Sequence, residues 1–187
     1  MTAGWATLSP VIAATWPPRG TSTLGPFRIA ENDGGGSRVR AACLADPTAN
    51  GAQITDSDID RAEAAMTALG QPTLFMVGSG QDALDTRLSD HGYSVQDPTL
   101  ALSSPTAPLA AAPPPVTCFQ TWPPLAIQQD IWAQGGVGSD RLAIMLRAKG
   151  PKFSVFGRIN DRPAGTAFVA LHGKTAMLHA LEVLPAA

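Results

Sequence analysis

The sequence carries little charge and no long apolar run. Asp, Glu, Lys and Arg make up 15% of its 187 residues, against about 25% in an average soluble domain. The net charge is −2 and like charges form no block, so the clustered lysines and arginines that bind nucleic acid are missing. The low-charge stretch 101–118 contains five prolines and cannot form the roughly 20-residue helix that spans a bilayer. We therefore expect neither nucleic acid nor a membrane as a partner.

Cysteine is also scarce. Cys43 and Cys118 lie far apart in the sequence and have no neighbours of metal-binding type, which is typical of reduced thiols inside a cell. The segment 1–16 lacks the positively charged leader of a secretory signal peptide. These features predict a cytoplasmic protein. No metal site is predicted, because the histidines lack the spacing of metal ligands: His91, His172 and His179.

Glycine and proline, in contrast, are abundant, with 18 and 17 residues. Prolines are densest in 103–116, where neither a helix nor a central strand can form and extended polyproline conformations are favoured. Hydrophobic residues reach 44%, enough to form a packed core. We expect two lobes, 1–104 and 116–187, joined by a Pro- and Ala-rich linker over 105–115.

The N-terminal lobe is predicted to combine helices, a hairpin and a βαβ unit, from its turn residues, helix caps and apolar periodicity. The predicted elements are a short helix before Trp16, hairpin strands at 25–30 and 37–44, a helix between Thr55 and Gly70, a strand at 73–77, a helix at 81–91 and a strand at 93–102. Three arginines of the hairpin, at 28, 38 and 40, leave two interpretations open, a solvated sheet face or an anion site.

The C-terminal lobe changes its periodicity along the chain. A strand at 116–122 and helices at 124–134 and 139–149 come first. Apolar residues then alternate with period two, and turn residues at 160–163 and 172–173 divide this region. The pattern predicts a three-stranded antiparallel meander over Lys152–Leu184. Two helices followed by such a meander indicate an α+β layer.

This lobe resembles the first half of GNAT-type N-acetyltransferases. The resemblance rests on the hairpin 160–167, which reads Asn-Asp-Arg-Pro-Ala-Gly-Thr-Ala, and on the strand 179–185, which ends in a V-x-P pattern. In that family such a strand precedes a glycine-rich loop and a helix whose amides receive the pyrophosphate of acetyl-CoA. The helices at 124–134 and 139–149 fit the family's acceptor-side helices.

The resemblance implies a GNAT-like acyl-CoA N-acyltransferase fold of the α+β class, with a mixed sheet flanked by helices. It implies transfer of an acetyl group from acetyl-CoA, as co-substrate, to an amine of a small molecule or a peptide. Leu181, Val183 and Leu184, at the splayed end of the last strand, would bind the pantetheine arm. Glu182 or His179 would remove the amine proton. Residues at this spacing leave a strand on opposite faces unless a bulge intervenes, so we expect only one of the two to face the cleft.

The rest of the chain follows the family pattern less fully. The strand at 73–77 and the helix that ends at Gly92–Tyr93 resemble the family's second half, but 87–89 reads Arg-Leu-Ser where the family often has a tyrosine as general acid. We therefore expect a degenerate first unit and a truncated second unit, which would be the active one in a longer protein. The glycine-rich loop is not among the 187 residues, so we expect this chain to bind acetyl-CoA poorly and to show little transfer activity, whereas a longer chain would bind the coenzyme and transfer the acetyl group. We also expect an open edge on the last strand, where a second copy could pair to form a homodimer.

Two alternatives to an acetyltransferase stay open. A non-catalytic GNAT-like module would bind acyl-CoA or a partner without turnover. A nucleotide-binding protein would use 78–83, which reads G-x-G-x-x-A, with Asp97 at the distance of a ribose-binding acid. However, Asp82 lies where the helix begins, and a carboxylate there favours the helix dipole and repels a pyrophosphate. We expect a tight turn at 78–83 with no bound dinucleotide.

Overall fold

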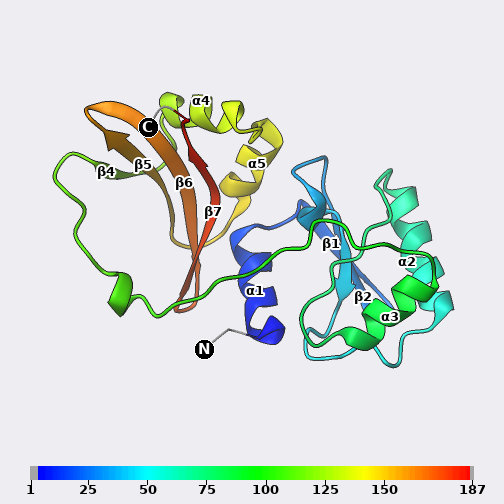
Figure 1. The fold of residues 1–187 in the computed structure, drawn as a ribbon. Helices are drawn as coiled ribbons and strands as arrows, with labels where there is room; N and C mark the ends of the chain where they lie inside the picture. Colours follow the sequence, from blue (N-terminus) through cyan, green and yellow to red (C-terminus); the bar gives the residue numbers. More distant parts are fainter. Residues whose placement is uncertain (1–3, 186–187) are drawn as a thin grey trace. The chain divides into compact units, whose positions relative to one another are not determined.

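The chain folds into two compact units. The computed structural model describes residues 4–185, and within them the protein is an α+β protein with five α-helices and two antiparallel sheets (Figure 1). The first unit comprises Met1–Pro10 and Pro18–Ser104, and the second comprises Val11–Pro17 and Pro105–Ala187. The predicted helix before Trp16 is confirmed as α1 (Trp5–Thr15), which contributes residues to both units.

The first unit is a small sheet that packs against two helices. Its elements are β1 (Gly20–Leu24), β2 (Phe27–Glu31), a 3-10 helix η1 (Ser37–Val39), β3 (Ala42–Leu44), α2 (Asp56–Ala68) and α3 (Asp82–Asp90). The sheet has the order β1-β2-β3 and is antiparallel. Its core joins apolar side chains of the sheet to those of both helices, so both helices cover the same face. The buried core residues are Phe27, Ile29, Ala42, Leu44, Ile54, Ile59, Ala62, Met66, Leu84 and Leu88.

Helix α2 begins at the predicted cap. The Thr55 hydroxyl accepts a hydrogen bond from the Asp58 amide (3.2 Å), and the Asp58 carboxylate accepts one from the Thr55 amide (2.9 Å). This reciprocal pair satisfies two amides that the first helical turn leaves without a partner. The hydrogen bond from the Thr55 hydroxyl to the same carboxylate is the main cause of the lowered pKa of Asp58. At the other end, Gly70 adopts φ +69°, which ends the helix as its sequence predicts.

The predicted hairpin strand at 37–44 is wrong over most of its length. Only Ala42–Leu44 pairs with β2, while Ser37–Val39 forms η1. The three preceding glycines at 34–36 all have positive φ, between +81° and +98°, so the chain turns sharply rather than continuing as a strand. Val39 is fully buried, which accounts for its apolar character without a strand. Of the three arginines nearby, Arg28 donates to Cys43 Sγ at 3.2 Å.

The predicted βαβ unit is also wrong. Within 73–77 the backbone makes one parallel bridge, between Phe75 and Ala42, instead of a strand. The segment 93–102 forms no strand at all, and most of it is exposed. The apolar residues that suggested strands serve other contacts: Phe75 packs edge-on against Phe27 and Tyr93, with ring centroids 5.2 Å apart in both pairs. The helix between these segments is confirmed as α3.

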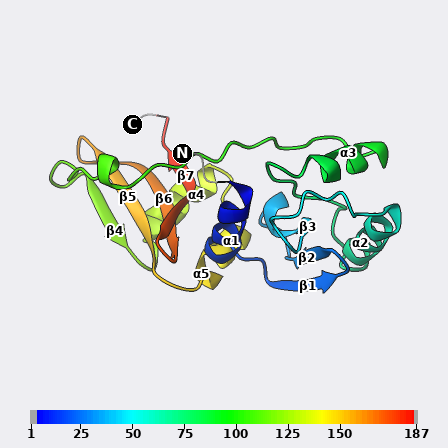
Figure 2. The same cartoon turned by 90° about the horizontal axis from the view of Figure 1, so that it is seen from below.

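The second unit is a four-stranded antiparallel sheet with the order β4-β5-β6-β7. Its elements are the 3-10 helix η2 (Ala107–Leu109), β4 (Cys118–Thr121), α4 (Ala126–Gln134), α5 (Ser139–Arg147), β5 (Lys152–Ile159), β6 (Arg162–His172) and β7 (Thr175–Val183). The four strands lie side by side in Figure 2, with β4 and β7 at the edges. The predicted meander over Lys152–Leu184 is confirmed, with no helix within 168–183. Its first turn lies at 160–161 as expected, and its second lies at 173–174, one residue later than predicted, because His172 ends β6 and pairs with Thr175.

A buried polar network fastens α4 to this sheet. Gln128 is fully buried, and its Oε1 accepts hydrogen bonds from the Leu125 amide (2.9 Å) and the Thr121 hydroxyl (2.7 Å). Its Nε2 donates to the Thr166 hydroxyl at 3.0 Å, and Ser154 Oγ lies 3.2 Å from Oε1. One amide therefore connects the first turn of α4 to β4, β5 and β6, and a buried polar group is costly when its partners are lost.

None of the helices that the structure describes between residues 4 and 185 is both long and apolar enough to cross a bilayer.

We expect Gln128→Leu to lower the free energy of unfolding by about 2–3 kcal/mol. Each buried hydroxyl that is left without its hydrogen-bond partner destabilises the folded state by about 1–3 kcal/mol. The matched control is Gln129→Leu, at an exposed neighbour on the same helix, and it should change stability little. Urea unfolding of both variants measures the difference. Equal stability of the two would mean that the network does not hold α4.

Candidate functional site

A bulge in β7 decides which way the predicted catalytic residues point. Across the β6–β7 ladder His179 pairs with Phe168, and Glu182 pairs with Thr166. The register shifts between these pairs, so two residues of β7 lie opposite one residue of β6. Phe168 and Thr166 are two residues apart and share a face. His179 and Glu182 therefore point to the same face of the sheet, the one covered by α4, and the bulge removes the opposite-face arrangement of an unbroken strand.

The bulge is held by a hydrogen bond from α4. Trp132 is fully buried in that helix, and its indole Nε1 donates to the Ala180 carbonyl at 2.7 Å. Ala180 has φ +47°, a left-handed conformation that a residue with a Cβ seldom adopts. Because the bulge turns this carbonyl away from regular strand pairing, the indole gives it the hydrogen-bond partner that it would otherwise lack inside the protein.

His179 is enclosed by aromatic and polar neighbours. Its side chain is 4% exposed and stacks on Trp16, with ring centroids 4.9 Å apart. Its Nε2 lies 2.9 Å from the Thr15 hydroxyl, which itself donates to the Val11 carbonyl at 2.7 Å. The hydroxyl proton is thus engaged, so the imidazole Nε2–H is the donor in this pair. An Nε2 that already carries a bonded proton is poorly suited to accept one from a substrate.

Glu182, in contrast, lines a cavity at the end of β7. The cavity has a volume of about 220 Å³ and lies between the last turn of α4 and the end of the strand. It is lined by Ile131, Gln134, Gly135, Glu182, Val183, Leu184 and Pro185. Gly135 makes room for the carboxylate: a Cβ built there would lie 2.2 Å from Glu182 Cδ. Glu182 is half-buried, so its carboxylate remains accessible from this cavity.

The three residues predicted to bind pantetheine are not brought into one cavity. Val183 and Leu184 line the cavity beside Glu182. Leu181 lies with Val183 along a second, wider hollow of about 370 Å³ that also involves β5 and β6. Both side chains are well exposed, Leu181 at 59% and Val183 at 65%.

The glycine motif at 78–83 forms the predicted turn. Asp82 is the first residue of α3, with Gln81 as its N-cap. The Gly78 amide already donates to Gln81 Oε1 at 2.9 Å, and a Cβ on Gly78 would lie 1.9 Å from the Trp5 ring. Gly78 therefore gives space to an indole of its own chain. Asp97, the proposed ribose acid, accepts a hydrogen bond from the Ser37 hydroxyl at 3.2 Å.

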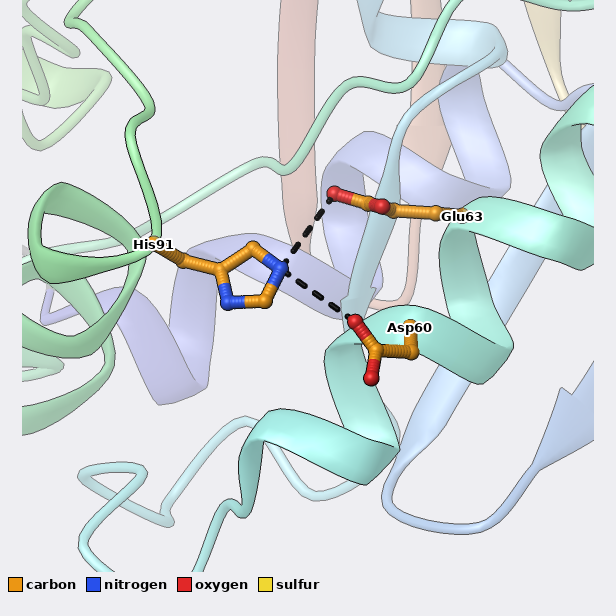
Figure 3. Close-up of side chains that lie close together, drawn as sticks. All are labelled: Asp60, Glu63 and His91. Carbon is orange, nitrogen blue, oxygen red and sulfur yellow. Dashed lines mark ion pairs between the residues drawn. The ribbon is translucent and has the colours of Figure 1, made fainter.

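A second group of polar side chains lies in the first unit, where no site was predicted. Asp60 and Glu63 of α2 face His91, which directly follows α3 (Figure 3). From the sequence, His91 is predicted only as the last residue of the helix at 81–91. The spacing of Asp60 and Glu63 places both on one helix face, but no local pattern connects them to a histidine that follows another helix.

Comparison with models of protein families, with curated proteins and with solved structures finds no match. The geometry of the chain's own residues is therefore the basis for a functional assignment.

We expect Trp132→Phe to lower the free energy of unfolding by about 2 kcal/mol or more. The Ala180 carbonyl, left without its donor, destabilises the folded state by about 1–3 kcal/mol. The smaller ring also leaves a void, which destabilises it further. Trp122→Phe, in the same unit, leaves the bond to Ala180 intact and is the control. Urea unfolding measures stability, and a crystal structure of the Trp132 variant shows the register of β7. An unchanged bulge at full stability would contradict the role given to the indole.

Proposed function

We propose that this chain is an acetyltransferase-like protein that transfers an acetyl group from acetyl-CoA to an amine, with Glu182 as general base. The observation that carries the proposal is the position of the Glu182 carboxylate, which lines a cavity at the end of an edge strand, beside Val183 and Leu184. A carboxylate in such a cavity can accept a proton from an amine held next to it.

The proposed reaction is a direct transfer. The amine nitrogen attacks the thioester carbonyl, a C–N bond forms, and the C–S bond breaks to release the coenzyme thiolate. The proton lost by the nitrogen passes to the Glu182 carboxylate, directly or through a water molecule, and then to the thiolate or to solvent. The chain contributes orientation and a proton acceptor, which are the two requirements of this chemistry.

The order of elements supports this proposal. In the second unit two helices, α4 and α5, separate β4 from the three-stranded meander β5-β6-β7. The resemblance to GNAT-type N-acetyltransferases implies the same order, with the acceptor on the side of the two helices. Glu182 points to that side, since it pairs with Thr166, whose hydroxyl is bonded to Gln128 of α4.

The cavity limits what can bind beside Glu182. Its volume of about 220 Å³ is smaller than the roughly 300–1,000 Å³ of a pocket that encloses a drug-sized ligand. It suits the acetylated end of the pantetheine arm and a small amine, while the nucleotide part of the coenzyme would have to lie outside it. Binding of the coenzyme by this chain is therefore expected to be weak.

Between the two predicted bases, the geometry favours Glu182. His179 is buried and donates to the Thr15 hydroxyl, and it is not among the residues that line the cavity. We assign it the role of a positioning residue, because it anchors the last strand against 11–17.

A non-catalytic module is the second candidate, since the same cavity could hold an acyl chain without turnover. The nucleotide-binding alternative at 78–83 has less support, because Trp5 lies against Gly78 and the side chain of Gln81 takes the Gly78 amide.

We expect Glu182→Gln to lower kcat for acetyl transfer by about 10²–10⁴-fold, the usual contribution of a general base, with a smaller change in acetyl-CoA binding. Asp130→Asn, an exposed acid on α4, is the matched control and should keep the wild-type rate. Chromatography of released coenzyme A, with a lysine peptide and a diamine as acceptors, gives the rates. Binding without turnover by the wild type would favour the module, and no binding at all would overturn the proposal.

Gly135→Ala tests the same carboxylate without changing its chemistry. The added methyl group would displace Glu182 Cδ, which lies at the end of a flexible side chain, so we expect kcat to fall at nearly unchanged stability. Gly138→Ala provides the control, because its Cβ would meet its neighbour, Asp140 Oδ1, only at 3.4 Å. The same rate assay and a urea unfolding curve measure both variants. A wild-type rate in Gly135→Ala would argue against Glu182 as the base.

A further inference from the structure

We infer that Asp60, Glu63 and His91 form a binding site for a divalent transition metal ion of the zinc type. Each residue offers one ligand atom, and the three atoms all lie within 4.8 Å of one another. The side chains of Asp60 and Glu63 on α2 and of His91, just after α3, point toward one another, as Figure 3 shows. This site is independent of the proposed acetyl transfer, because all its residues belong to the first unit.

The distances fit a small coordination sphere. His91 Nε2 lies 3.4 Å from Asp60 Oδ1 and 3.8 Å from Glu63 Oε1. Ligands bound tetrahedrally at about 2.0–2.2 Å from zinc are about 3.3–3.6 Å from each other. The two pairs that include His91 would need shifts of a few tenths of an ångström. The two carboxylate oxygens, which lie within 4.8 Å of each other, would have to approach by as much as about 1.2 Å. A spacing of three residues on α2 keeps both carboxylates on one face of the helix.

The backbone and a neighbouring tyrosine fix two of the ligands. His91 is the C-cap of α3, where Gly92 adopts φ +94° and the Tyr93 amide donates to the Leu88 carbonyl at 2.9 Å. The Tyr93 hydroxyl donates to Glu63 Oε1 at 2.6 Å. This hydrogen bond orients the Glu63 carboxylate, whose Oε1 lies 3.8 Å from His91 Nε2. Hydrogen bonds of this kind hold ligating carboxylates in known metal sites.

The charges of α2 are divided in a way that favours this site. Two other acids of the helix have guanidinium partners: Asp56 pairs with Arg87, and Asp58 pairs with Arg61. Among residues 4–185, the ion-pair partner found for Asp60 and for Glu63 is His91. With a neutral imidazole the three ligands carry a charge of −2, which a divalent cation neutralises.

The donor set also selects the kind of ion. One imidazole nitrogen with two carboxylate oxygens suits zinc and its transition-metal neighbours, whereas calcium and magnesium prefer oxygen ligands alone. The exposure of the three side chains, 25% for His91, 32% for Glu63 and 66% for Asp60, leaves one side of the site open. Water or a further ligand would complete the coordination there.

Titration calorimetry with zinc chloride on the full chain tests the site. The Cys118→Ser background is used, because this cysteine is exposed and free and thiolates bind zinc. We expect one equivalent to bind, and His91→Gln and Asp60→Asn each to weaken binding at least tenfold. His172→Gln, which removes an exposed imidazole, is the matched control and should bind as the parent does. The same affinity in His91→Gln, or no saturable binding in the parent, would overturn the inference.

A second measurement separates metal binding from a change in folding. Thermal unfolding with and without zinc should show an increase in Tm in the parent that is lost in both ligand variants, whatever their Tm without metal. Calcium should give no increase. The visible absorption of bound cobalt reports directly on imidazole coordination and should disappear in His91→Gln. A zinc-dependent increase in Tm that persists in His91→Gln would show that the ion binds elsewhere, and no increase in the parent would show that the three residues form an ion pair only.

Discussion

The second unit depends on one hydrogen bond between a helix and an irregular strand residue. The indole of Trp132 donates to the Ala180 carbonyl, and Ala180 holds a backbone conformation that costs free energy for any residue with a Cβ. The bulge fixed in this way shifts the alternation of side chains between the two faces of the sheet by one residue in the rest of β7. In a strand without the bulge, the Glu182 side chain would lie on the opposite face of the sheet, and the exposed Leu181 or Val183 would face α4. The position of the candidate base thus follows from a contact made two residues earlier in the strand.

The two units are stabilised in different ways. The first has an apolar core shared by a sheet and two helices, and its buried amide, Gln81, bonds to backbone groups of two loop residues, Gly78 and Ala49. The second places a fully buried amide, Gln128, at the centre of the contacts between α4 and three strands. Apolar packing tolerates changes of shape, whereas a network of buried hydrogen bonds permits one arrangement and penalises others. Such a network suits a unit in which a cavity and a carboxylate must keep a fixed geometry.

What the sequence could predict depended on how local the determining contacts are. The meander and the capped helix after Thr55 follow from turn residues, caps and periodicity within a few positions, and both are confirmed. The predictions of strands at 37–44 and 93–102 are wrong over most or all of their length, because residues such as Val39, fully buried, and Tyr93, partly buried, pack into the protein without belonging to a strand themselves. The bulge depends on a tryptophan 48 residues away, and the carboxylates of α2 lie beside a histidine that follows another helix. No local pattern contains either contact.

The bond between His179 and Thr15 makes the second unit discontinuous in sequence. These partners are 164 residues apart, and Pro18–Ser104 folds as the other unit in between. The entropic free-energy cost of closing such a loop is about 2.5 kcal/mol higher than that of closing a loop of ten residues. Contacts between residues so far apart in the sequence also slow folding. During synthesis, 11–17 must wait until the last strand has left the ribosome, while all residues of the first unit have been made much earlier. The chain therefore has a built-in order of assembly, in which its early segment completes the unit that is synthesised after the first.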